Sequence, residues 1–305
     1  MNRFDLIIIG GGPAGYAAAL YSTRGGLSTA LIERMGPGGQ LSLTDTIDNY
    51  PGFEQGIDGF TLGMKMQATA ERFGALTVYD EVLSVDLSKE VKRISTSSGE
   101  YSAKCVIIAT GANPRELGLP REKDLLSRGV HYCAHCDGRF YADKTVAVVG
   151  GGNSAVSDAL YLSKLCKKVY LIHRRDELRA TKLYHEPLLS CKNIEFLKST
   201  AVDELIGDGR LEGIRIKDLK SEKVEELPVS ALFVSIGRKP ASELFRESLE
   251  LDAAGYVIAD ESTRTSIPGV FVAGDVRTKE LRQVVTAVSD GAVAAHNAIE
   301  YLNTL

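Results

Sequence analysis

The sequence predicts an α/β fold in which one strand–turn–helix unit occurs twice. The first observation is a repeat: IIIGGGPAGYAAALY, which starts at Ile7, recurs as VVGGGNSAVSDALY, which starts at Val148. The two stretches align without a gap when Gly10 is placed on Gly150. The second observation is context, because each glycine run lies between a β-branched run and an alanine-rich helical pattern.

Each small residue of the repeated motif has a physical role. The first glycine permits a tight turn from strand to helix, the second lets a pyrophosphate approach the backbone, and the third position lets helix and strand pack closely. The helix N-terminus then offers free N–H groups and the positive end of its dipole. We therefore expect two Rossmann-like dinucleotide-binding loops. Their residues are Gly10, Gly12, Pro13, Ala14 and Gly15 in the first copy and Gly150, Gly152, Asn153, Ser154 and Ala155 in the second.

The two copies differ at the end of their second strand. The first has Glu33, an acid suited to a ribose hydroxyl, as in FAD or NAD. The second has His173 in the same place. Three arginines follow it, Arg174, Arg175 and Arg179, whose guanidinium groups suit a 2′-phosphate. A solvated helix start is the alternative, but the register with Glu33 favours a nucleotide site, so we predict FAD for the first copy and NADPH for the second.

Matching segments close the two units. CVIIATGANP (105–114) and ALFVSIGRKP (231–240) each combine an apolar strand, a glycine turn and a proline, whereas IPGVFVAGDV (267–276) occurs once. The simplest topology inserts the second unit into the first. We therefore predict a discontinuous FAD-binding domain, residues 1–114 and 244–305, into which an NADPH-binding domain, residues 115–243, is inserted.

Composition and charge narrow the possible functions. The chain has 305 residues, enough for two domains, and a net charge of −4 gives no basic surface for nucleic acid or anionic membrane. No apolar run is long enough to span a membrane. The first residues, MNRFDLIIIGGG, indicate a strand rather than a signal peptide. We therefore expect a cytoplasmic protein without nucleic-acid or membrane partners.

Two cysteines, Cys133 and Cys136, stand in the stretch HYCAHCDGRF (131–140), inside the predicted NADPH domain. A zinc site completed by His131 and His135 would crowd its ligands, and the chain has no second CxxC. A buried, inert pair fits this polar stretch poorly. A redox-active disulfide in a protein with flavin and NADPH explains the pair better than either alternative, and we expect no metal.

Together these motifs resemble the low-molecular-weight, bacterial-type thioredoxin reductases, which belong to the pyridine nucleotide-disulfide oxidoreductase family. The resemblance covers nearly the whole chain. GGQL and RQVVT are its most specific motifs, because in that family they lie around the flavin. The matching stretches are GGGPAG (10–15), GGQL (38–41), NYPGF (49–53), ATG (109–111), CAHCDG (133–138), GGGNSA (150–155), HRRDELR (173–179), GVFVAGD (269–275) and RQVVTAVSDGA (282–292).

The resemblance implies an NADPH-dependent thioredoxin-disulfide reductase, with thioredoxin as substrate and a homodimer as assembly. The FAD site that it implies comprises Gly10, Gly12, Pro13, Ala14, Gly15, Glu33, Arg34, Gly39, Gln40, Leu41, Asn49, Val82, Ala109, Thr110, Gly111, Gly274, Asp275, Arg282, Gln283 and Val284. The implied NADPH site comprises Gly150, Gly152, Asn153, Ser154, Ala155, His173, Arg174, Arg175, Arg179, Ile236 and Gly237.

The resemblance also implies roles for the catalytic residues. In that family the second cysteine, here Cys136, faces the flavin and opens the substrate disulfide, and the first, here Cys133, resolves the mixed disulfide. Asp137 is the expected general acid/base for the leaving thiolate. The alternatives are a dithiol oxidase of the same fold, a ferredoxin-dependent thioredoxin reductase and a non-enzymatic flavin redox sensor. The NADPH motif argues against the first two, and a CxxC beside an NADPH site argues against the third.

Overall fold

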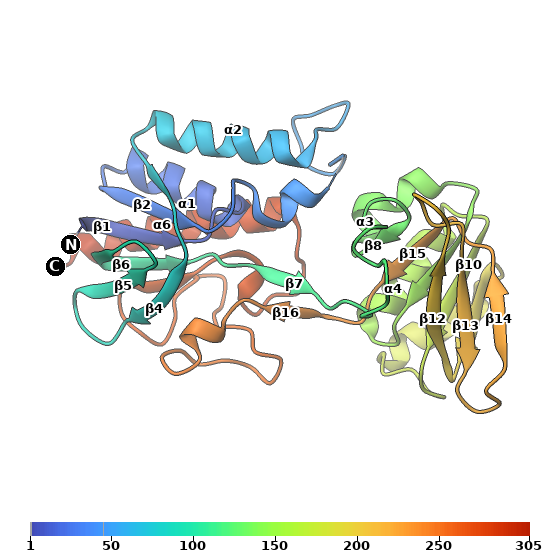
Figure 1. Ribbon diagram of the computed structural model, residues 1–305. Helices are drawn as coiled ribbons and strands as arrows, with labels where there is room; N and C mark the ends of the chain where they lie inside the picture. Colours follow the sequence, from blue (N-terminus) through green and yellow to red (C-terminus); the bar gives the residue numbers. More distant parts are fainter. Residues whose placement is uncertain (1, 45) are drawn as a thin grey trace. The chain divides into compact units, whose positions relative to one another are not determined.

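The computed structural model describes residues 2–44 and 46–305 of the chain. The chain divides into two compact units. Unit 1 comprises Met1–Asn113 and Lys239–Leu305, and unit 2 comprises Pro114–Arg238. The second unit is therefore a continuous stretch inserted between the two halves of the first (Figure 1).

Unit 1 is built on a seven-stranded sheet. Its strands are β1 (Asn2–Ile9), β2 (Thr29–Glu33), β3 (Leu76–Tyr79), β4 (Val82–Asp86), β5 (Lys92–Thr96), β6 (Glu100–Ile108) and β17 (Val270–Val272). The order is β3-β2-β1-β6-β5-β4, and β17 also pairs with β6. Strands β3, β2, β1, β6 and β17 are parallel neighbours, whereas β4, β5 and the first half of β6 form an antiparallel meander.

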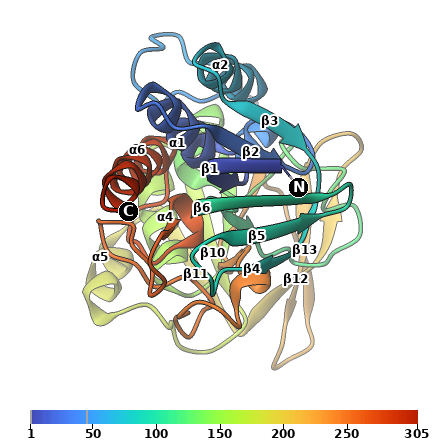
Figure 2. The same cartoon turned by 90° about the vertical axis from the view of Figure 1, so that its left-hand side faces the viewer.

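The parallel strands of unit 1 are buried on both faces, so alternate side chains enter two different cores. Leu6 and Ile8 face a core shared with the helices, and Ile7 and Ile9 face the opposite core. Helices α1 and α6 lie side by side against the sheet (Figure 2), and a Cβ on Gly291 of α6 would lie 2.1 Å from the carbonyl oxygen of Ala14 in α1. The helices of the unit are α1 (Pro13–Arg24), α2 (Gly59–Arg72) and α6 (Val284–Asn303), with short 3-10 turns η1 (Gly39–Leu43), η4 (Glu243–Phe245) and η5 (Gly274–Val276).

Unit 2 contains a five-stranded parallel sheet and a three-stranded antiparallel sheet. The parallel strands are β8 (Val130–His131), β9 (Thr145–Val149), β10 (Lys168–His173), β11 (Ile194–Lys198) and β15 (Ala231–Val234), in the order β11-β10-β9-β15-β8. The antiparallel strands are β12 (Thr200–Ile206), β13 (Gly213–Asp218) and β14 (Val224–Leu227). The helices are α3 (Ala134–Asp137), α4 (Asn153–Ser163) and α5 (His185–Ser190), with 3-10 turns η2 (Gly138–Tyr141) and η3 (Lys182–Tyr184).

The repeat in the sequence is a repeat of fold. The order β3-β2-β1-β6 in unit 1 is matched by β11-β10-β9-β15 in unit 2, and each unit adds an antiparallel meander. The predicted α/β class with two Rossmann-like units is therefore confirmed. The chain passes between the units through β7 (Ala112–Pro114) and β16 (Arg238–Pro240), which pair with each other. Among the described residues, no helix is both long and apolar enough to cross a bilayer.

Candidate active site

The first glycine loop joins β1 to α1 in a turn that only glycine permits. Gly10 has a φ of +109°, and a Cβ there would lie 2.4 Å from the carbonyl oxygen of Ala109. A Cβ on Gly15 would lie 1.9 Å from the carbonyl oxygen of Gly10. The strand and the helix therefore approach as closely as the motif predicts.

Gly12, in contrast, borders free space. A Cβ on Gly12 would contact only the carbonyl oxygen of Gly38, at 4.0 Å. Gly12 is also the N-cap of α1 and has no side chain with which to cap it, and Pro13 follows. The first-turn N–H groups of α1 are therefore available to an anion in this space, which suits a pyrophosphate.

Glu33, at the end of β2, is held by the loop itself. Its Oε2 accepts the N–H of Gly11 at 2.6 Å, and its Oε1 accepts the N–H of Met35 at 3.0 Å. Two backbone donors thus fix the carboxylate beside the glycine loop, where a ribose hydroxyl can donate to it. Arg34 is exposed and lies 3.4 Å from Glu81.

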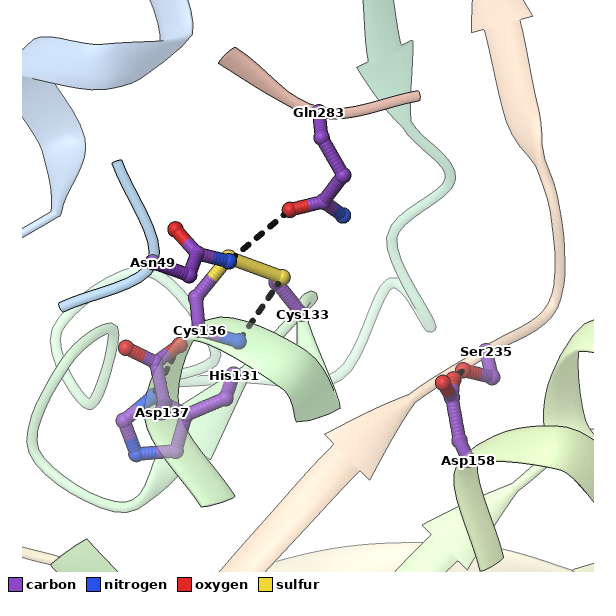
Figure 3. Close-up of a disulfide and its surroundings, with 8 residues drawn as sticks. All are labelled: Asn49, His131, Cys133, Cys136, Asp137, Asp158, Ser235 and Gln283. Carbon is purple, nitrogen blue, oxygen red and sulfur yellow. Dashed lines mark hydrogen bonds and ion pairs between the residues drawn. A yellow bond between two sulfur atoms is a disulfide. The ribbon is translucent and has the colours of Figure 1, made fainter. Parts of the chain in front are cut away.

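The other residues predicted for the flavin all lie in unit 1. Since β1, β2, β6 and β17 are parallel, the segments that follow them meet at one edge of the sheet. Gln40 of η1 donates from Nε2 to Asn113 Oδ1 at 2.9 Å, and Asn49 donates from Nδ2 to Gln283 Oε1 at 3.0 Å (Figure 3). The remaining residues are Gly39 and Leu41 in η1, Val82 at the start of β4, Ala109, Thr110 and Gly111 after β6, and Gly274 and Asp275 in η5.

The beginning of α6 brings two more of these residues to the site. Helix α6 starts at Val284, and its N-cap Gln283 donates its N–H to Thr286 Oγ1 at 3.1 Å. The guanidinium of Arg282 lies 4.1 Å from the centroid of the Tyr256 ring and donates from Nη2 to the carbonyl oxygen of Arg277 at 3.2 Å. Contacts within the protein therefore hold the Arg282 side chain in place without a ligand.

A buried ion cluster, which sequence reasoning missed, anchors η5 to α6. Asp290 Oδ2 accepts the N–H of Gly274 and Arg277 Nε, both at 2.9 Å, and lies 2.8 Å from Lys279 Nζ. Burial opposes ionisation of Asp290, but the hydrogen bonds from Arg277 and Lys279 outweigh it and lower the pKa of the carboxyl. The cluster holds the turn that carries Asp275. In the sequence, Asp290 is a single polar residue in a helical stretch, and no local pattern predicts the cluster.

The second glycine loop, between β9 and α4, repeats the first with one change. Gly150 has a φ of +151°, and a Cβ there would lie 2.3 Å from the carbonyl oxygen of Ser235 and 2.6 Å from the Cβ of Ala155. Gly152 is the uncapped N-cap of α4, and a Cβ on it would contact nothing within 4 Å. The loop thus has the same free space for a pyrophosphate. Asn153 accepts the N–H of Thr181 on its Oδ1 at 2.8 Å, and Ser154 is exposed.

The end of β10 separates the predicted NADPH side chains into two kinds. His173 is buried beneath Gly151, and its Nε2 lies 3.1 Å from the carbonyl oxygen of Glu177. Burial, followed by the nearby arginines, lowers the pKa of His173, so the ring is neutral at pH 7 and supplies no charge. Arg174, Arg175 and Arg179 are all exposed, and in the described part of the chain no carboxylate pairs with them. These three side chains carry the positive charge that a 2′-phosphate needs.

Two further residues predicted for NADPH follow β15. Gly237 has a φ of +104°, and its carbonyl oxygen accepts the N–H of Arg115 at 3.0 Å. Ile236 packs against the core between the two sheets of unit 2. Gly237 therefore shapes the turn after β15, as Gly111 with its φ of +71° does after β6.

Cys133 and Cys136 form a disulfide on α3, with their Cα atoms 5.3 Å apart (Figure 3). Cys133 is the N-cap of this short helix, and its Sγ accepts the N–H of Cys136 at 3.2 Å. Both cysteines are partly exposed. In the described part of the chain, no group of three or more His, Cys, Asp or Glu side chains is placed to hold a metal ion. The pair is thus accessible for thiol–disulfide exchange.

Asp137, which directly follows the disulfide, is not isolated. Its Oδ2 lies 3.0 Å from His131 Nδ1, and the Nε2 of the same ring lies 2.7 Å from the hydroxyl of Tyr141. Sequence reasoning considered His131 only as a zinc ligand and did not consider Tyr141. The contact depends on β8 and η2 being packed together, and the sequence offers no signal for it.

Comparison with known proteins agrees with this geometry. The family model described as pyridine nucleotide-disulphide oxidoreductase matches residues 4–291. A thioredoxin reductase of Peptoclostridium acidaminophilum is 45% identical over 307 residues, which cover 99% of this chain and 98% of that protein. One from Treponema pallidum is 43% identical over 302 residues, with 99% and 98% covered. The crystal structure of thioredoxin reductase from Streptococcus pyogenes matches with a TM-score of 0.93 at 42% identity, covering 99% of both chains.

Fold, site and comparisons therefore point the same way. The two uncapped glycine loops and the disulfide lie in a chain whose full length matches these relatives. The resemblance read from the sequence is confirmed. The chain belongs to the pyridine nucleotide-disulphide oxidoreductase family and, within it, to the low-molecular-weight thioredoxin reductases.

Proposed function

We propose that the chain is an NADPH-dependent flavoprotein that passes electrons through FAD and the Cys133–Cys136 disulfide to oxidised thioredoxin. The observation that carries the proposal is the position of the disulfide. It is formed on α3, in the same unit as a glycine loop followed by three exposed arginines. The disulfide thus lies in the same unit as the predicted binding loop for NADPH, the electron donor. A zinc site or an inert cysteine pair would not account for this combination.

The residues of the two units fit the two cofactors differently. When bound, NADPH would supply the hydride and FAD would carry the two electrons, chemistry that no side chain provides. In unit 1, the N-terminus of α1 would bind the FAD pyrophosphate and Glu33 the ribose. In unit 2, the N-terminus of α4 would bind the NADPH pyrophosphate. Arg174 and Arg175 would bind its 2′-phosphate.

The chain's own residues perform the disulfide exchange. Asp137 first takes the proton of the Cys136 thiol, and the Cys136 thiolate attacks one sulfur of the substrate disulfide. The other substrate sulfur leaves as a thiolate and takes this proton from Asp137. Cys133 then attacks the Cys136 sulfur and re-forms the enzyme disulfide, and the proton lost by Cys133 passes to the second substrate sulfur, which leaves as a thiol. In the disulfide form the Cys136 N–H donates to Cys133 Sγ at 3.2 Å, and a donor so placed favours negative charge on this sulfur when the pair opens.

Substrate, assembly and compartment are parts of the same proposal. Thioredoxin is the proposed substrate because the relatives reported above carry that activity in their names. The proposed homodimer follows the family resemblance, and light scattering of the purified protein measures it directly. We place the reaction in the cytoplasm, where protein thiols are kept reduced.

An anaerobic titration of the purified yellow protein tests the proposal. One equivalent of NADPH is expected to bleach the flavin spectrum, one equivalent of NADH to bleach it much less, and oxidised thioredoxin to restore the yellow form. Bleaching by NADPH with reoxidation by oxygen alone would indicate a dithiol oxidase. No bleaching by either nucleotide, but bleaching by reduced ferredoxin, would indicate a ferredoxin-dependent enzyme. Each of these two results contradicts the proposal.

A further inference from the structure

His131 links Asp137 to Tyr141 through both nitrogens of its ring. Nδ1 lies 3.0 Å from Asp137 Oδ2, and Nε2 lies 2.7 Å from the Tyr141 hydroxyl. The His131 side chain is only 5% exposed, and that of Asp137 is 17% exposed. Figure 3 shows the carboxylate and the imidazole facing each other on α3 and β8.

The ring of His131 is also fixed in orientation. It stacks on Phe233 of β15 with 5.4 Å between centroids and 28° between planes. Tyr141 meets the same Phe233 edge-on, at 88°. Strands β8 and β15 are in register, with His131 opposite Phe233. The packing therefore directs one nitrogen to Asp137 and the other to Tyr141, and the ring cannot turn without breaking these contacts.

Hydrogen-bond chemistry then determines which nitrogen carries the proton. An ionised carboxylate only accepts hydrogen bonds, so Nδ1 carries the proton that is donated to Asp137. In the neutral ring Nε2 is therefore an acceptor, and the Tyr141 hydroxyl donates to it. Tyr141 thus favours the tautomer that presents a donor to Asp137.

We propose that His131 is the positioning residue of Asp137 in disulfide exchange and that Tyr141 holds the tautomer of His131. The proposal rests on the proposed role of Asp137 as the acid that protonates the leaving thiolate. One carboxylate oxygen is fixed by His131, so that the other is presented in a constant direction to the thiols. No electron passes through this trio, and its net proton content is unchanged over a turnover.

Two variants of His131 distinguish a role in positioning Asp137 from a purely structural role in packing. In His131→Asn the amide nitrogen takes nearly the place of Nδ1, whereas in His131→Gln it takes nearly the place of Nε2. If His131 positions Asp137, the Asn variant retains thioredoxin reduction to within about threefold, and the Gln variant loses about tenfold, a part of the roughly 10²–10⁴-fold that general acid–base catalysis supplies. A purely structural role predicts the opposite order, since Gln is closer to His in volume.

A comparison of two disulfide substrates gives a second test, because misfolding would slow the reduction of both substrates equally. An alkyl thiolate such as that of thioredoxin needs a proton as it leaves, whereas the aromatic thiolate from 5,5′-dithiobis(2-nitrobenzoate) is stable without one. His131→Gln is therefore expected to slow reduction of thioredoxin and not of the aromatic disulfide. Tyr132→Phe, which removes a hydroxyl bonded to Glu122 at 2.8 Å, is the matched control and should change neither rate. An equal loss with both disulfides overturns the proposal.

A double variant shows whether His131 acts through Asp137. In Asp137→Asn the positioned group is absent, so adding His131→Gln should cost nothing further. Additive losses would overturn the proposal. If Asp137→Asn alone leaves thioredoxin reduction unchanged, the proposed role of Asp137 fails, and the inference about His131 fails with it. Flavin bleaching by NADPH, followed in every variant, reports whether the proposed overall function holds independently of this result.

Discussion

The two glycine loops make the same tight turn from strand to helix, but different side chains pack beneath them. A Cβ on Gly11 would lie 2.9 Å from Glu33 Cγ, and a Cβ on Gly151 would lie 2.3 Å from His173 Cε1. In each unit, therefore, the residue that ends the second strand packs under the middle glycine of the loop. The glycines set the shape of the loop, and the side chain beneath it is free to differ.

The difference supports the proposal that the two units bind different nucleotides. Glu33 is a carboxylate whose two oxygens are held by backbone N–H groups. His173 is a neutral spacer, and the charge of its unit lies one to six residues further along, on exposed arginines. We propose that ribose recognition in unit 1 depends on this one anchored group. Phosphate recognition in unit 2 would then depend on several exposed groups.

The largest effect is expected when the third small residue of each glycine motif, Gly15 or Ala155, is replaced by its counterpart in the other motif. In Gly15→Ala the new Cβ would lie 1.9 Å from the Gly10 carbonyl oxygen, so the first loop must distort, and we expect protein purified without bound flavin. The mirror variant Ala155→Gly removes a Cβ from the second loop and should cost about 0.5–1 kcal/mol in unfolding free energy. The ratio of flavin to protein absorbance measures the first change, and chemical denaturation measures the second. Retention of FAD by Gly15→Ala would contradict this expectation, since the first loop would then accommodate a Cβ at this position as the second loop does.

A smaller effect is expected from removing the arginines. The double variant Arg174→Ala with Arg175→Ala loses the charge-assisted hydrogen bonds to the 2′-phosphate, so the KM for NADPH should rise about 100-fold while that for NADH stays the same. Arg210→Ala is the control, because Arg210 is an exposed arginine of the same unit that lies outside both predicted cofactor sites. Steady-state kinetics with both nucleotides checks this. An equal rise with NADH would assign the arginines to a structural role.

The smallest effect is a dependence on pH that belongs to one loop only. Burial lowers the pKa of His173 in the folded protein, so the unfolded chain binds a proton more readily. Stability is therefore complete above the ordinary histidine pKa of about 6.5 and falls as the pH drops below it towards the folded value. Thermal unfolding between pH 5 and 8 should show this slope, and His173→Gln should flatten it. An unchanged slope in that variant would place the titrating group elsewhere.

Much of this architecture was predictable because its signals are local. The glycines, the β-branched runs and the register of Glu33 with His173 all follow from short stretches of sequence. The meanders β4-β5-β6 and β12-β13-β14 and helix α2 were not predicted, because their strands pair and their faces pack through contacts that no short motif encodes.

The same limit applies to the site. Asp290 gathers Arg277 and Lys279 only after α6 has packed beside η5, and Tyr141 reaches His131 only after η2 has packed beside β8. Neither contact has a sequence signature. The assignment of individual residues to FAD and NADPH, and the predicted domain ranges 1–114 with 244–305 and 115–243, stay predictions.

The pairing of β7 with β16 has a consequence for the engineering of the chain. The Arg115 N–H donates to the Gly237 carbonyl oxygen at 3.0 Å, so the inserted unit begins and ends at neighbouring points. An insertion with adjacent ends adds little loop-closure entropy to its host, whatever its length. The inserted unit therefore joins its host at this hairpin without interrupting the host sheet. By the same reasoning, joining Asn113 to Lys239 with a short turn should yield a host domain that folds and binds flavin alone.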